Sequence, residues 1–583
     1  MRKNVLFVLC LLLSVTAAVA RVIPREKAAA TAAEFLRTAS PAAVGVQPGS
    51  LRLVKESPSM YVFEKEGGGF VIAAADDIAA PVLAYSGDGR FPVDDMPANM
   101  RSLLDWYERV IAFAVEKGWE ADASAARPLV GAGSGTEVKL KTARWGQGTP
   151  FNDLSPTIDG QKCPSGCVAT AMAIIMKYYG YPDCGTGTLP GYDFGWDDAA
   201  QQYKYHIDGY ALGHTYDWAN MPEDPSNCNE YQAAQIAQLL YDIGVMSGMN
   251  YAPGGSGAPS MSPLRLTQYF GYDKSMQYVD RIYFSTEKWE QMIRDEIDAG
   301  RPVFHCGFNP DGGHAFVMDG YRGRYFSINY GWSGGSAWYL ISPIEGHEKE
   351  LTAFYDGQDM ILRFMPDAGG KPVPSVMVPD SFLPFRWNFE EESVWGGWFW
   401  FWYYGFYSTE MEIAYGLFDR DEKFKKSVSE MVTLNPTMEY VPEMTITFPD
   451  KIEDGDQILL ARRDGSNWTP LPQSRQSRIQ FDRSRKLPQM VSVGHSFGRP
   501  DAYQADGTPQ VFFDMYKDVW WEIEREDGML MADSSLEDIP VSVTATMLDS
   551  ETGLARFEIS LSEGTYRMTV RNFDETLSFT FTL

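Results

Sequence analysis

CPSGCVATAMAIIMKYYG, residues 163–180, places two cysteines four positions apart at the head of an apolar segment. Gly166 directly precedes Cys167 and small residues follow it, which predicts a helix that begins at Cys167 and packs closely against its neighbours. Unpaired N–H groups and the positive end of the helix dipole at that position favour a thiolate, the nucleophilic form of cysteine. Cys163 lies before a proline, in the approaching loop. The position of Cys167 therefore predicts a nucleophile, although both thiols could also be buried packing groups or disulfide partners.

A second stretch, GGHAFVMDGYRGRYFSINYGWSGG (residues 312–335), is typical of two strands joined by a turn. His314 begins the first strand, and Asn329 lies near the end of the second. A four-residue loop at 320–323 would place these two residues directly opposite each other, and a two-residue loop at Arg322-Gly323 would make them diagonal neighbours. Either register predicts an Asn–His contact, whereas an earlier turn would break it.

An amide held against one imidazole nitrogen fixes the tautomer and directs the other nitrogen at a thiol, as in a Cys-His-Asn triad. This logic predicts His314 as general base and acid and Asn329 as the residue that orients it. His305 and Cys306 are adjacent in a strand-like run, so their side chains should point to opposite faces and serve in packing.

Acyl transfer also needs hydrogen-bond donors for the developing oxyanion. The backbone N–H of Cys167 could supply one, and the amide of Gln147, in the stretch RWGQGTPFN, could supply the second, with Gln161 as its rival. Glycines before His314 would let an extended substrate backbone approach closely, and a tryptophan after Asn329 is placed to exclude water. The predicted substrate-binding residues are Gly312, Gly313 and Trp332.

Length and charge limit what the chain can be. Its 583 residues predict several domains, and 78 acidic against 50 basic residues give a net charge of −28. Such a charge repels phosphate backbones and anionic lipid, so a nucleic-acid partner is not expected. No run after the first twenty residues has the length of an apolar membrane helix, so no membrane span is expected.

The first twenty residues combine a basic start, an apolar core and Ala18-Val19-Ala20, which together predict a signal peptide over residues 1–20. A lipid-anchored Cys10 is a poor alternative, because Cys10 lies inside the apolar core with no small residue before it. The predicted location is secreted, whether periplasmic, extracellular or on a bacterial cell surface.

Composition and periodicity then predict four domains. An α+β unit covers residues 21–138 and ends in a Gly/Ser-rich joint, and the cysteine-bearing domain, helix first and strands later, covers 139–366. After a Pro/Gly-rich linker, alternating runs predict antiparallel β-sandwiches of the immunoglobulin-like kind over 367–490 and 491–583. The aromatic run WFWFWYYGF at 398–406 is either a sugar-stacking face or, more commonly, a buried strand.

Five cysteines follow the predicted signal peptide, and in an oxidising compartment an odd number leaves at least one thiol outside any disulfide. Cys163 could pair with Cys184, Cys228 or Cys306, and these four would make two disulfides with Cys167 left free. A zinc site formed by Cys163 and Cys167 with His305 or His314 is a weak alternative, because C-x3-C lacks a second close pair. No cofactor is expected.

Four blocks in this order, WGQGTPFN, CPSGCVATAMAIIMKYYGYP, TYDWANM and GGHAFVMDGYRGRYFSINYGWSGG, resemble the streptopain-like cysteine peptidases. Upstream, GGGFVIAAADDIAAPVLAYSGDG resembles the inhibitory propeptide of that family, so the resemblance covers roughly residues 21–366. The family usually has tryptophan directly after the asparagine, whereas this chain has Tyr330. By resemblance, Cys167 is the nucleophile, His314 the base, Asn329 the orienting residue and Gln147 the oxyanion donor.

The resemblance implies an α+β fold class, with a papain-like peptidase domain, a preceding α+β propeptide and the all-β domains after it. The implied activity is that of a secreted cysteine endopeptidase zymogen that acts on polypeptides, with its own propeptide as intramolecular inhibitor until the joint at 127–144 is cut. The alternative is an inactive papain-fold homologue that serves as a binding or adhesion module. The C-terminal domains could contact a surface or carbohydrate.

Overall fold

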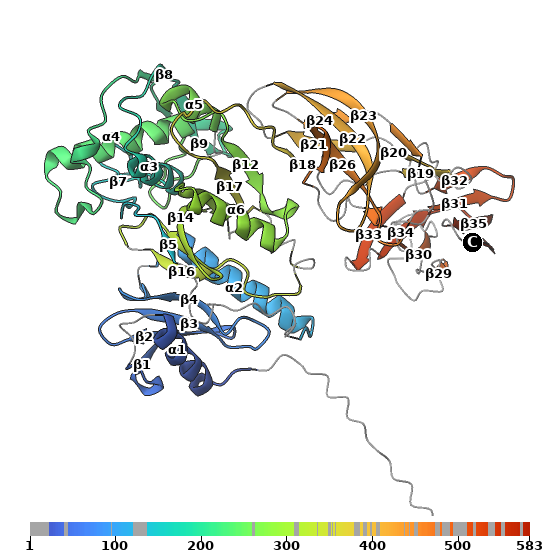
Figure 1. Ribbon diagram of the computed structural model, residues 1–583, viewed down its shortest axis with the longest axis horizontal. Coiled ribbons are helices and arrows are strands. Elements are labelled where there is room, and N and C mark those ends of the chain that lie inside the picture. The colour runs from blue at the N-terminus through green and yellow to red at the C-terminus, as the bar shows by residue number, and fades with distance from the viewer. Residues whose placement is uncertain are drawn as a thin grey trace, which may run out of the picture.

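The computed structural model (Figure 1) describes most of the chain up to residue 377 and many separate strands beyond it. The described residues are 22–39, 45–94, 96–120, 137–258, 263–307, 314–334, 336–347, 351, 354–355, 357–377, 385–388, 393–396, 399–403, 408–435, 438–441, 444–447, 453–472, 479–480, 490–493, 510–516, 520–533, 543–549, 554–571 and 575–582. The predicted signal peptide, most of the predicted cleavage joint, Gly312 and Gly313 lie outside them.

The helix predicted at Cys167 is confirmed and begins at that residue. Its cap residue, Gly166, has a φ of +91°, and a Cβ there would lie 2.6 Å from Sδ of Met249. Glycine adopts this backbone conformation without strain and leaves room for Met249, so the path of the chain into the helix is fixed at Gly166. The described helices are α1 (Arg25–Ala39), α2 (Ala98–Glu116), α3 (Cys167–Tyr179), α4 (Glu230–Ser247), α5 (Pro263–Phe270) and α6 (Thr286–Asp298).

An antiparallel sheet of eleven strands runs through the N-terminal unit and the cysteine-bearing domain without a break, because β4 pairs with β16. In spatial order its strands are β1 (Leu51–Glu56), β2 (Met60–Lys65), β3 (Phe70–Ala74), β4 (Val82–Ser86), β16 (Ala337–Leu340), β15 (Tyr325–Asn329), β14 (His314–Arg322), β13 (Val303–Gly307), β17 (Asp359–Leu362) and β12 (Gln277–Asp280), with β5 (Val138–Lys139) paired to β14. The N-terminal unit is thus joined to the second domain by the pairing of β4 with β16 and by a shared hydrophobic core.

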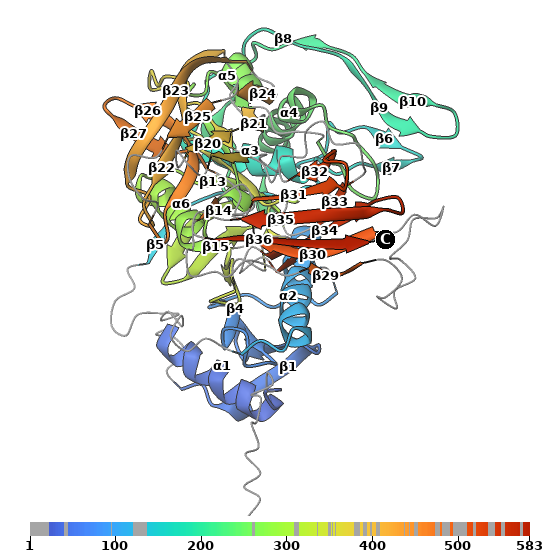
Figure 2. The ribbon, with the colours of Figure 1, turned by 90° about the vertical axis from the view of Figure 1, so that its right-hand side faces the viewer.

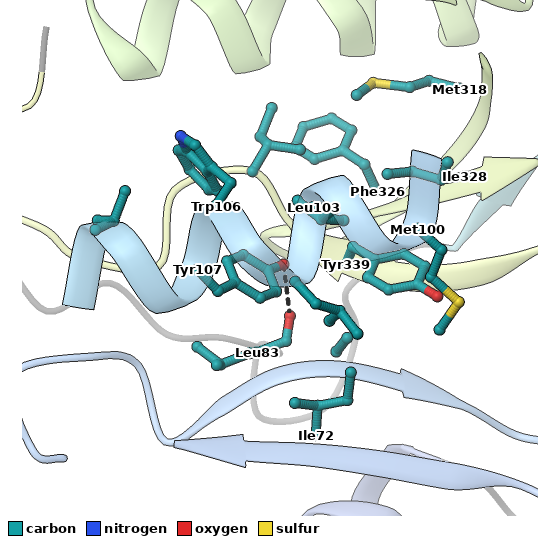
Figure 3. Close-up of a cluster of buried hydrophobic side chains, with 14 of the residues drawn as sticks. Ile72, Leu83, Met100, Leu103, Trp106, Tyr107, Met318, Phe326, Ile328 and Tyr339 are labelled. Atoms are coloured by element: carbon teal, nitrogen blue, oxygen red, sulfur yellow. Dashed lines mark hydrogen bonds between the residues drawn. The ribbon is translucent and has the colours of Figure 1, made fainter. Parts of the chain in front are cut away.

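Helices from different parts of the chain cover the two faces of this sheet at β14. Helix α3 packs on the face that carries Ala315 and Val317, whereas α2, from the N-terminal unit, packs on the face that carries Phe316 and Met318. Figure 3 shows α2 between the strands of the two units, with its buried side chains turned to both. Tyr107 of α2 donates a hydrogen bond to the carbonyl oxygen of Leu83 at 3.2 Å.

Both predicted registers of the β14–β15 hairpin are wrong. Arg322 pairs with Tyr325, so Gly323-Arg324 form the turn, and a bulge at Asp319 shifts the pairing further along. Asn329 therefore lies opposite Val317, three residues from His314. The bulge has a long-range cause, since the buried Asp319 carboxylate accepts hydrogen bonds from Thr142 and Ser336 and forms an ion pair with Lys139 of β5.

Three two-stranded ladders lie outside the large sheet. They are β6 (Thr157–Ile158) with β7 (Gln161–Lys162), β8 (Thr188–Leu189) with β11 (Tyr210–Ala211), and β9 (Tyr192–Asp197) with β10 (Gln202–Ile207). Figure 2 shows the β9–β10 hairpin projecting from the body of the molecule.

The chain from β18 onward is all-β in its described residues, which completes the predicted fold class of α+β domains followed by all-β domains. The first sheets are β18 (Val376–Met377), β21 (Phe399–Tyr403) and β24 (Met438–Val441); β19 (Phe385–Asn388), β20 (Ser393–Gly396) and β25 (Met444–Thr447); and β23 (Phe424–Leu434), β22 (Thr409–Phe418), β26 (Gln457–Asp464) and β27 (Asn467–Pro470), with β28 (Ile479–Gln480) on β26. Two four-stranded sheets follow: β29 (Met490–Val493), β30 (Gln510–Tyr516), β34 (Leu554–Ser560) and β33 (Val543–Asp549); and β32 (Leu530–Asp533), β31 (Trp520–Arg525), β35 (Thr565–Arg571) and β36 (Thr576–Thr582).

Leu103 tests the shared core between α2 and the large sheet. It is fully buried, so Leu103→Ala should cost about 2–5 kcal/mol of stability through lost contacts and a cavity. We expect the first thermal unfolding transition of the full chain to move to a lower temperature, whereas the exposed Arg109→Ala, on the same helix, should leave it within error. Equal midpoints for the two variants would contradict a core shared by the two units.

Candidate active site

Helix α3 brings the Cys167 thiol to the strand that carries His314. The thiol lies at the backbone N–H of Ala315, the residue directly after His314. Burial raises the pKa of the Cys167 thiol, while hydrogen bonds from the backbone N–H groups of Ala315 and Val168 lower it. The Cys167 thiol therefore lies at the backbone of the residue that follows the predicted base, where the start of α3 packs against the start of β14.

His314 is the first described residue of β14 and pairs with Gly307 of β13. Its ring is only partly exposed, and burial lowers the pKa of the imidazole. Burial thus acts on both groups in the same sense, because it disfavours the thiolate of Cys167 and the imidazolium of His314. Both shifts favour the neutral forms of the two side chains.

Asn329 is buried. Among the described residues, the hydrogen-bond partners of its carboxamide are residues other than His314. Its Nδ2 donates to Thr142 Oγ1 at 3.1 Å and to the Ala143 carbonyl at 2.9 Å, and its Oδ1 accepts from the Gly331 N–H at 3.1 Å. Both amide hydrogens are therefore used, and Oδ1 keeps one acceptor site. The direct pairing with His314 that the hairpin register predicted is replaced by contacts with the segment that precedes the site.

Gln147 lies beside the loop that leads into α3. Its backbone carbonyl accepts a hydrogen bond from the Ser165 N–H at 3.0 Å, and the residue is 6% exposed. Its rival, Gln161, is exposed on the β6–β7 hairpin. The chain path therefore favours Gln147 over Gln161 as a group near the nucleophile.

Trp332 is the one large apolar side chain among the predicted site residues that stays accessible, with 44% of its surface exposed. Gly331 before it packs against α3, where a Cβ would lie 2.8 Å from Cγ2 of Thr170. After it, the Ser333 N–H donates to the Trp145 carbonyl at 3.0 Å. These contacts fix the turn that carries Trp332 next to α3 and the loop of Gln147.

Sequence reasoning missed Asn99. This residue of α2 is 1% exposed, and its Nδ2 donates to the carbonyl oxygens of Tyr330 at 2.8 Å and Ala315 at 3.4 Å. The amide thus bridges β14 and the end of β15 where their pairing has stopped, and one of its acceptors belongs to Ala315, the residue whose backbone the Cys167 thiol contacts. An asparagine at the head of a predicted helix is read as an N-cap, but α2 begins at Ala98, so Asn99 lies in the first turn.

The predicted disulfides are wrong for this structure, because all five described cysteines are free. They lie on separate elements: Cys163 is buried in the loop before α3, and Cys306 in β13 is directly opposite Ala315. His305 and Cys306 do face opposite sides of the sheet, as predicted, since His305 stacks on Phe316 at 5.0 Å whereas Cys306 belongs to the core under α3.

Two kinds of feature are absent from the described part of the chain. No three His, Cys, Asp or Glu side chains are grouped there so that they could hold a metal ion, which gives no support to the zinc alternative. No helix among the same residues has the length and apolar character to cross a membrane.

Comparisons with known proteins find related chains. The model of the Peptidase C10 family matches residues 145–339, and that of the Spi protease inhibitor matches residues 20–111. Streptopain of Streptococcus pyogenes is 32% identical over 295 residues, which cover 48% of this chain and 72% of that relative. Thiol protease/hemagglutinin PrtT of Porphyromonas gingivalis is 34% identical over 335 residues, 54% of this chain but only 38% of that relative.

Among solved structures, a fragment of prointerpain A from Prevotella intermedia is 31% identical, with a TM-score of 0.46. The similarity covers 55% of this chain and 99% of that fragment. Active interpain A of the same organism is 32% identical, with a TM-score of 0.34, and covers 40% of this chain.

The protonation state of Cys167 gives a pH prediction. Because burial raises the pKa of its thiol, alkylation of Cys167 in the uncut chain should be slower at pH 7 than that of free cysteine, whose pKa is about 8.5. The rate should climb with pH and continue to rise above pH 9. Iodoacetamide labelling followed by peptide mapping measures it, and a rate already at its plateau between pH 5 and 7 would mean that the uncut chain holds a thiolate.

Proposed function

Because the chain belongs to the peptidase C10 family of cysteine peptidases, we propose that it is the secreted zymogen of a cysteine endopeptidase that acts through a Cys-His-Asn mechanism. The observation that carries this proposal is the position of the Cys167 thiol at the backbone of Ala315, directly after His314. The N-terminus of α3 supplies unpaired N–H groups at the same point. Polypeptides are the proposed substrates.

In the proposed reaction, the imidazole of His314 takes the proton of the Cys167 thiol, and Sγ attacks the carbonyl carbon of a peptide bond. The Cys167 N–H and the Gln147 amide donate hydrogen bonds to the oxyanion. His314 then returns the proton to the leaving amine, the C–N bond breaks and a thioester remains on Sγ. Water, deprotonated by His314, attacks the thioester, the C–S bond breaks, and the proton goes back to the thiol.

Asn329 is proposed to orient His314 through the remaining acceptor site on its Oδ1. Its other contacts support that role, because they fix the carboxamide in one orientation against Thr142, Ala143 and Gly331. Trp332 is proposed to shield this region and to contact substrate, together with Gly312 and Gly313. The exposed fraction of Trp332 leaves its ring available for such a contact.

The N-terminal unit is proposed to hold the enzyme latent. Asn99 occupies the gap between the carbonyls of Ala315 and Tyr330, and α2 covers the sheet face opposite α3. These contacts would hold the strands that flank Cys167 in a form unsuited to catalysis. Removal of the unit would let solvent reach the strands that flank the dyad, and the pKa values would then move toward those of an active pair.

Activation is proposed to cut the joint at 127–144, in its part before β5. Beyond that point the chain is already tied to the second domain, because the Leu140 N–H donates to the Asp319 carbonyl at 2.7 Å and Lys139 pairs with the Asp319 carboxylate. A cut before Val138 leaves those contacts in place, whereas a later cut removes part of the support of Asn329.

For the C-terminal β domains, contact with a surface or with carbohydrate remains our proposal. The aromatic run at 398–406 lies partly outside the described residues. Within the described part, Phe401 and Tyr403 are buried, which supports a packing role for those two side chains and leaves any carbohydrate contact to other residues.

Substitution of the two neighbouring cysteines tests the mechanism. Cys167→Ala should abolish peptide hydrolysis and propeptide cleavage, because Cys167 carries the thiol at the helix start, whereas the neighbouring Cys306 is buried in β13. Cys163→Ala should keep both, since Cys163 lies in the loop core. Fluorogenic peptide assays and the electrophoretic pattern of processing measure these outcomes. Persistent activity in the Cys167 variant would show that the nucleophile is another residue, whereas a processed wild-type chain without peptidase activity would favour the alternative of an inactive papain-fold binding module.

Asn99→Ala tests the proposed latency. The variant loses two hydrogen bonds next to the dyad, worth about 1–3 kcal/mol for buried groups. Cys167 in the uncut chain should therefore be labelled by a thiol-directed epoxide about tenfold faster than in the wild type. Asp105→Ala, an exposed change on the same helix, is the control. If the Asn99 and Asp105 variants were labelled at the same rate, the amide bridge would have no part in latency.

A further inference from the structure

Four residues on neighbouring strands form a row that starts at the nucleophile. Ala315 of β14 pairs with Cys306 of β13, Cys306 with Asp359 of β17, and Asp359 with Asp280 of β12. Directly paired residues present their side chains on the same face of a sheet. Because Ala315 and Cys306 belong to the face under α3, Asp359 and Asp280 lie on the side of the sheet that the Cys167 thiol also faces.

The row is the last one at this end of the sheet. In the described chain, β17 begins at Asp359 and β12 ends at Asp280, so α3 packs over the next row inward, which contains the buried Val317, Phe304 and Ile361. Asp359 and Asp280 therefore lie at the margin of the core, at the same end of the eleven-stranded sheet as Cys167.

Asp359 has no cationic partner within the part of the chain that the structure describes. Its Oδ1 is buried and accepts no hydrogen bond, and it faces a second carboxylate, Asp280, directly across the ladder. Asp280 has a separate use for its own oxygen, since Oδ1 accepts the Ile282 N–H at 3.1 Å. Burial and Asp280 together raise the pKa of Asp359 to about 7, against hydrogen bonds from Tyr278 and Cys306. An added positive charge would satisfy Oδ1 and relieve the repulsion.

The row also lies on one definite side of the proposed reaction centre. Trp332, Ser333 and the loop of Gln147 adjoin the β15 side of β14, and this is the side on which His314 and Trp332 would meet the leaving amine. Cys306 and Asp359 lie on the β13 side, where the acyl half of the substrate, on the amino-terminal side of the scissile bond, would bind. Two strand spacings, about 10 Å, separate Asp359 from Ala315.

That distance matches the reach of one residue type. An extended substrate advances about 3.3 Å per residue, so the second residue on the amino-terminal side of the scissile bond lies about two steps from the carbonyl. A lysine or arginine side chain extends from there across the remaining gap, with its aliphatic stem along Ala315 and Cys306. Arginine has the further advantage of a fork that binds carboxylate oxygens in pairs.

We infer that Asp359 selects a lysine or arginine at the second position on the amino-terminal side of the bond that is cut. The inference rests on the proposed endopeptidase function and adds a substrate class to it. Asp359 is in this account a specificity-determining residue that touches the substrate side chain and takes no part in bond cleavage.

The test compares peptides that differ only at that second position. The full chain, activated by its own processing, is assayed with fluorogenic peptides that carry arginine, its neutral isostere citrulline, lysine or leucine there. For the wild type, kcat/KM for arginine should exceed that for citrulline by about ten- to a hundredfold, the value of a hydrogen bond to a charged group. In Asp359→Asn the ratio should fall to about threefold or less, and in Asp359→Glu a preference for arginine should return.

Controls separate the possible failures. Asp208→Asn removes an equally negative but fully exposed carboxylate and should leave the arginine-to-citrulline ratio unchanged. Titration of Cys167 with a thiol-directed epoxide gives the concentration of competent enzyme in each variant, so that misfolding is not mistaken for lost selectivity. Peptide cleavage with a wild-type ratio near one, or a high ratio that survives in Asp359→Asn, would overturn the inference alone. Absence of any peptide cleavage by Cys167-competent protein would overturn the proposed function and this inference with it.

Discussion

The packing of the N-terminus of α3 against the start of β14 is the constraint on which the rest of the site depends. Gly166 allows only one entry into the helix, because its φ of +91° and the nearby Met249 exclude a side chain. This entry places the first helical residue, Cys167, at the backbone of Ala315. Strand pairing then fixes the positions of His314, Cys306 and the end of β15 relative to the thiol.

The same sheet connects the N-terminal unit to the chemistry. Because β4 continues the ladder into β16 and α2 packs against β14, the N-terminal unit shares a ladder and a core with the second domain. The latency that we propose would depend on the same contacts. Loss of the unit would expose the edge of the sheet at β16 and the apolar face under α2. The segment from Lys139 to Ala143 must remain, because Lys139 pairs with Asp319 and the Ala143 carbonyl holds Asn329.

Much of this arrangement could be predicted from the sequence. The helix start at Cys167 follows from a local pattern of small and apolar residues, and the two strands of the hairpin follow from alternation. The register could not be predicted, because the bulge at Asp319 depends on Lys139 and Thr142, which are far away in sequence, as well as on the nearer Ser336. Asn99 was missed for the same reason, since its two acceptors are carbonyls more than two hundred residues away.

Charge and burial act together at the site. The chain carries a net charge of −28, yet no charged group is among the causes that shift the pKa values of Cys167 and His314, and desolvation favours the neutral form of both. The central claim is that Cys167 and His314 are neighbours in the folded chain. Treatment with 1,3-dibromoacetone tests it directly, because Cys167 Sγ displaces one bromide and a nearby imidazole nitrogen displaces the other. Peptide mapping should find a single cross-link that joins Cys167 to His314. A cross-link to another histidine, or a singly attached reagent with an intact His314, would contradict the account.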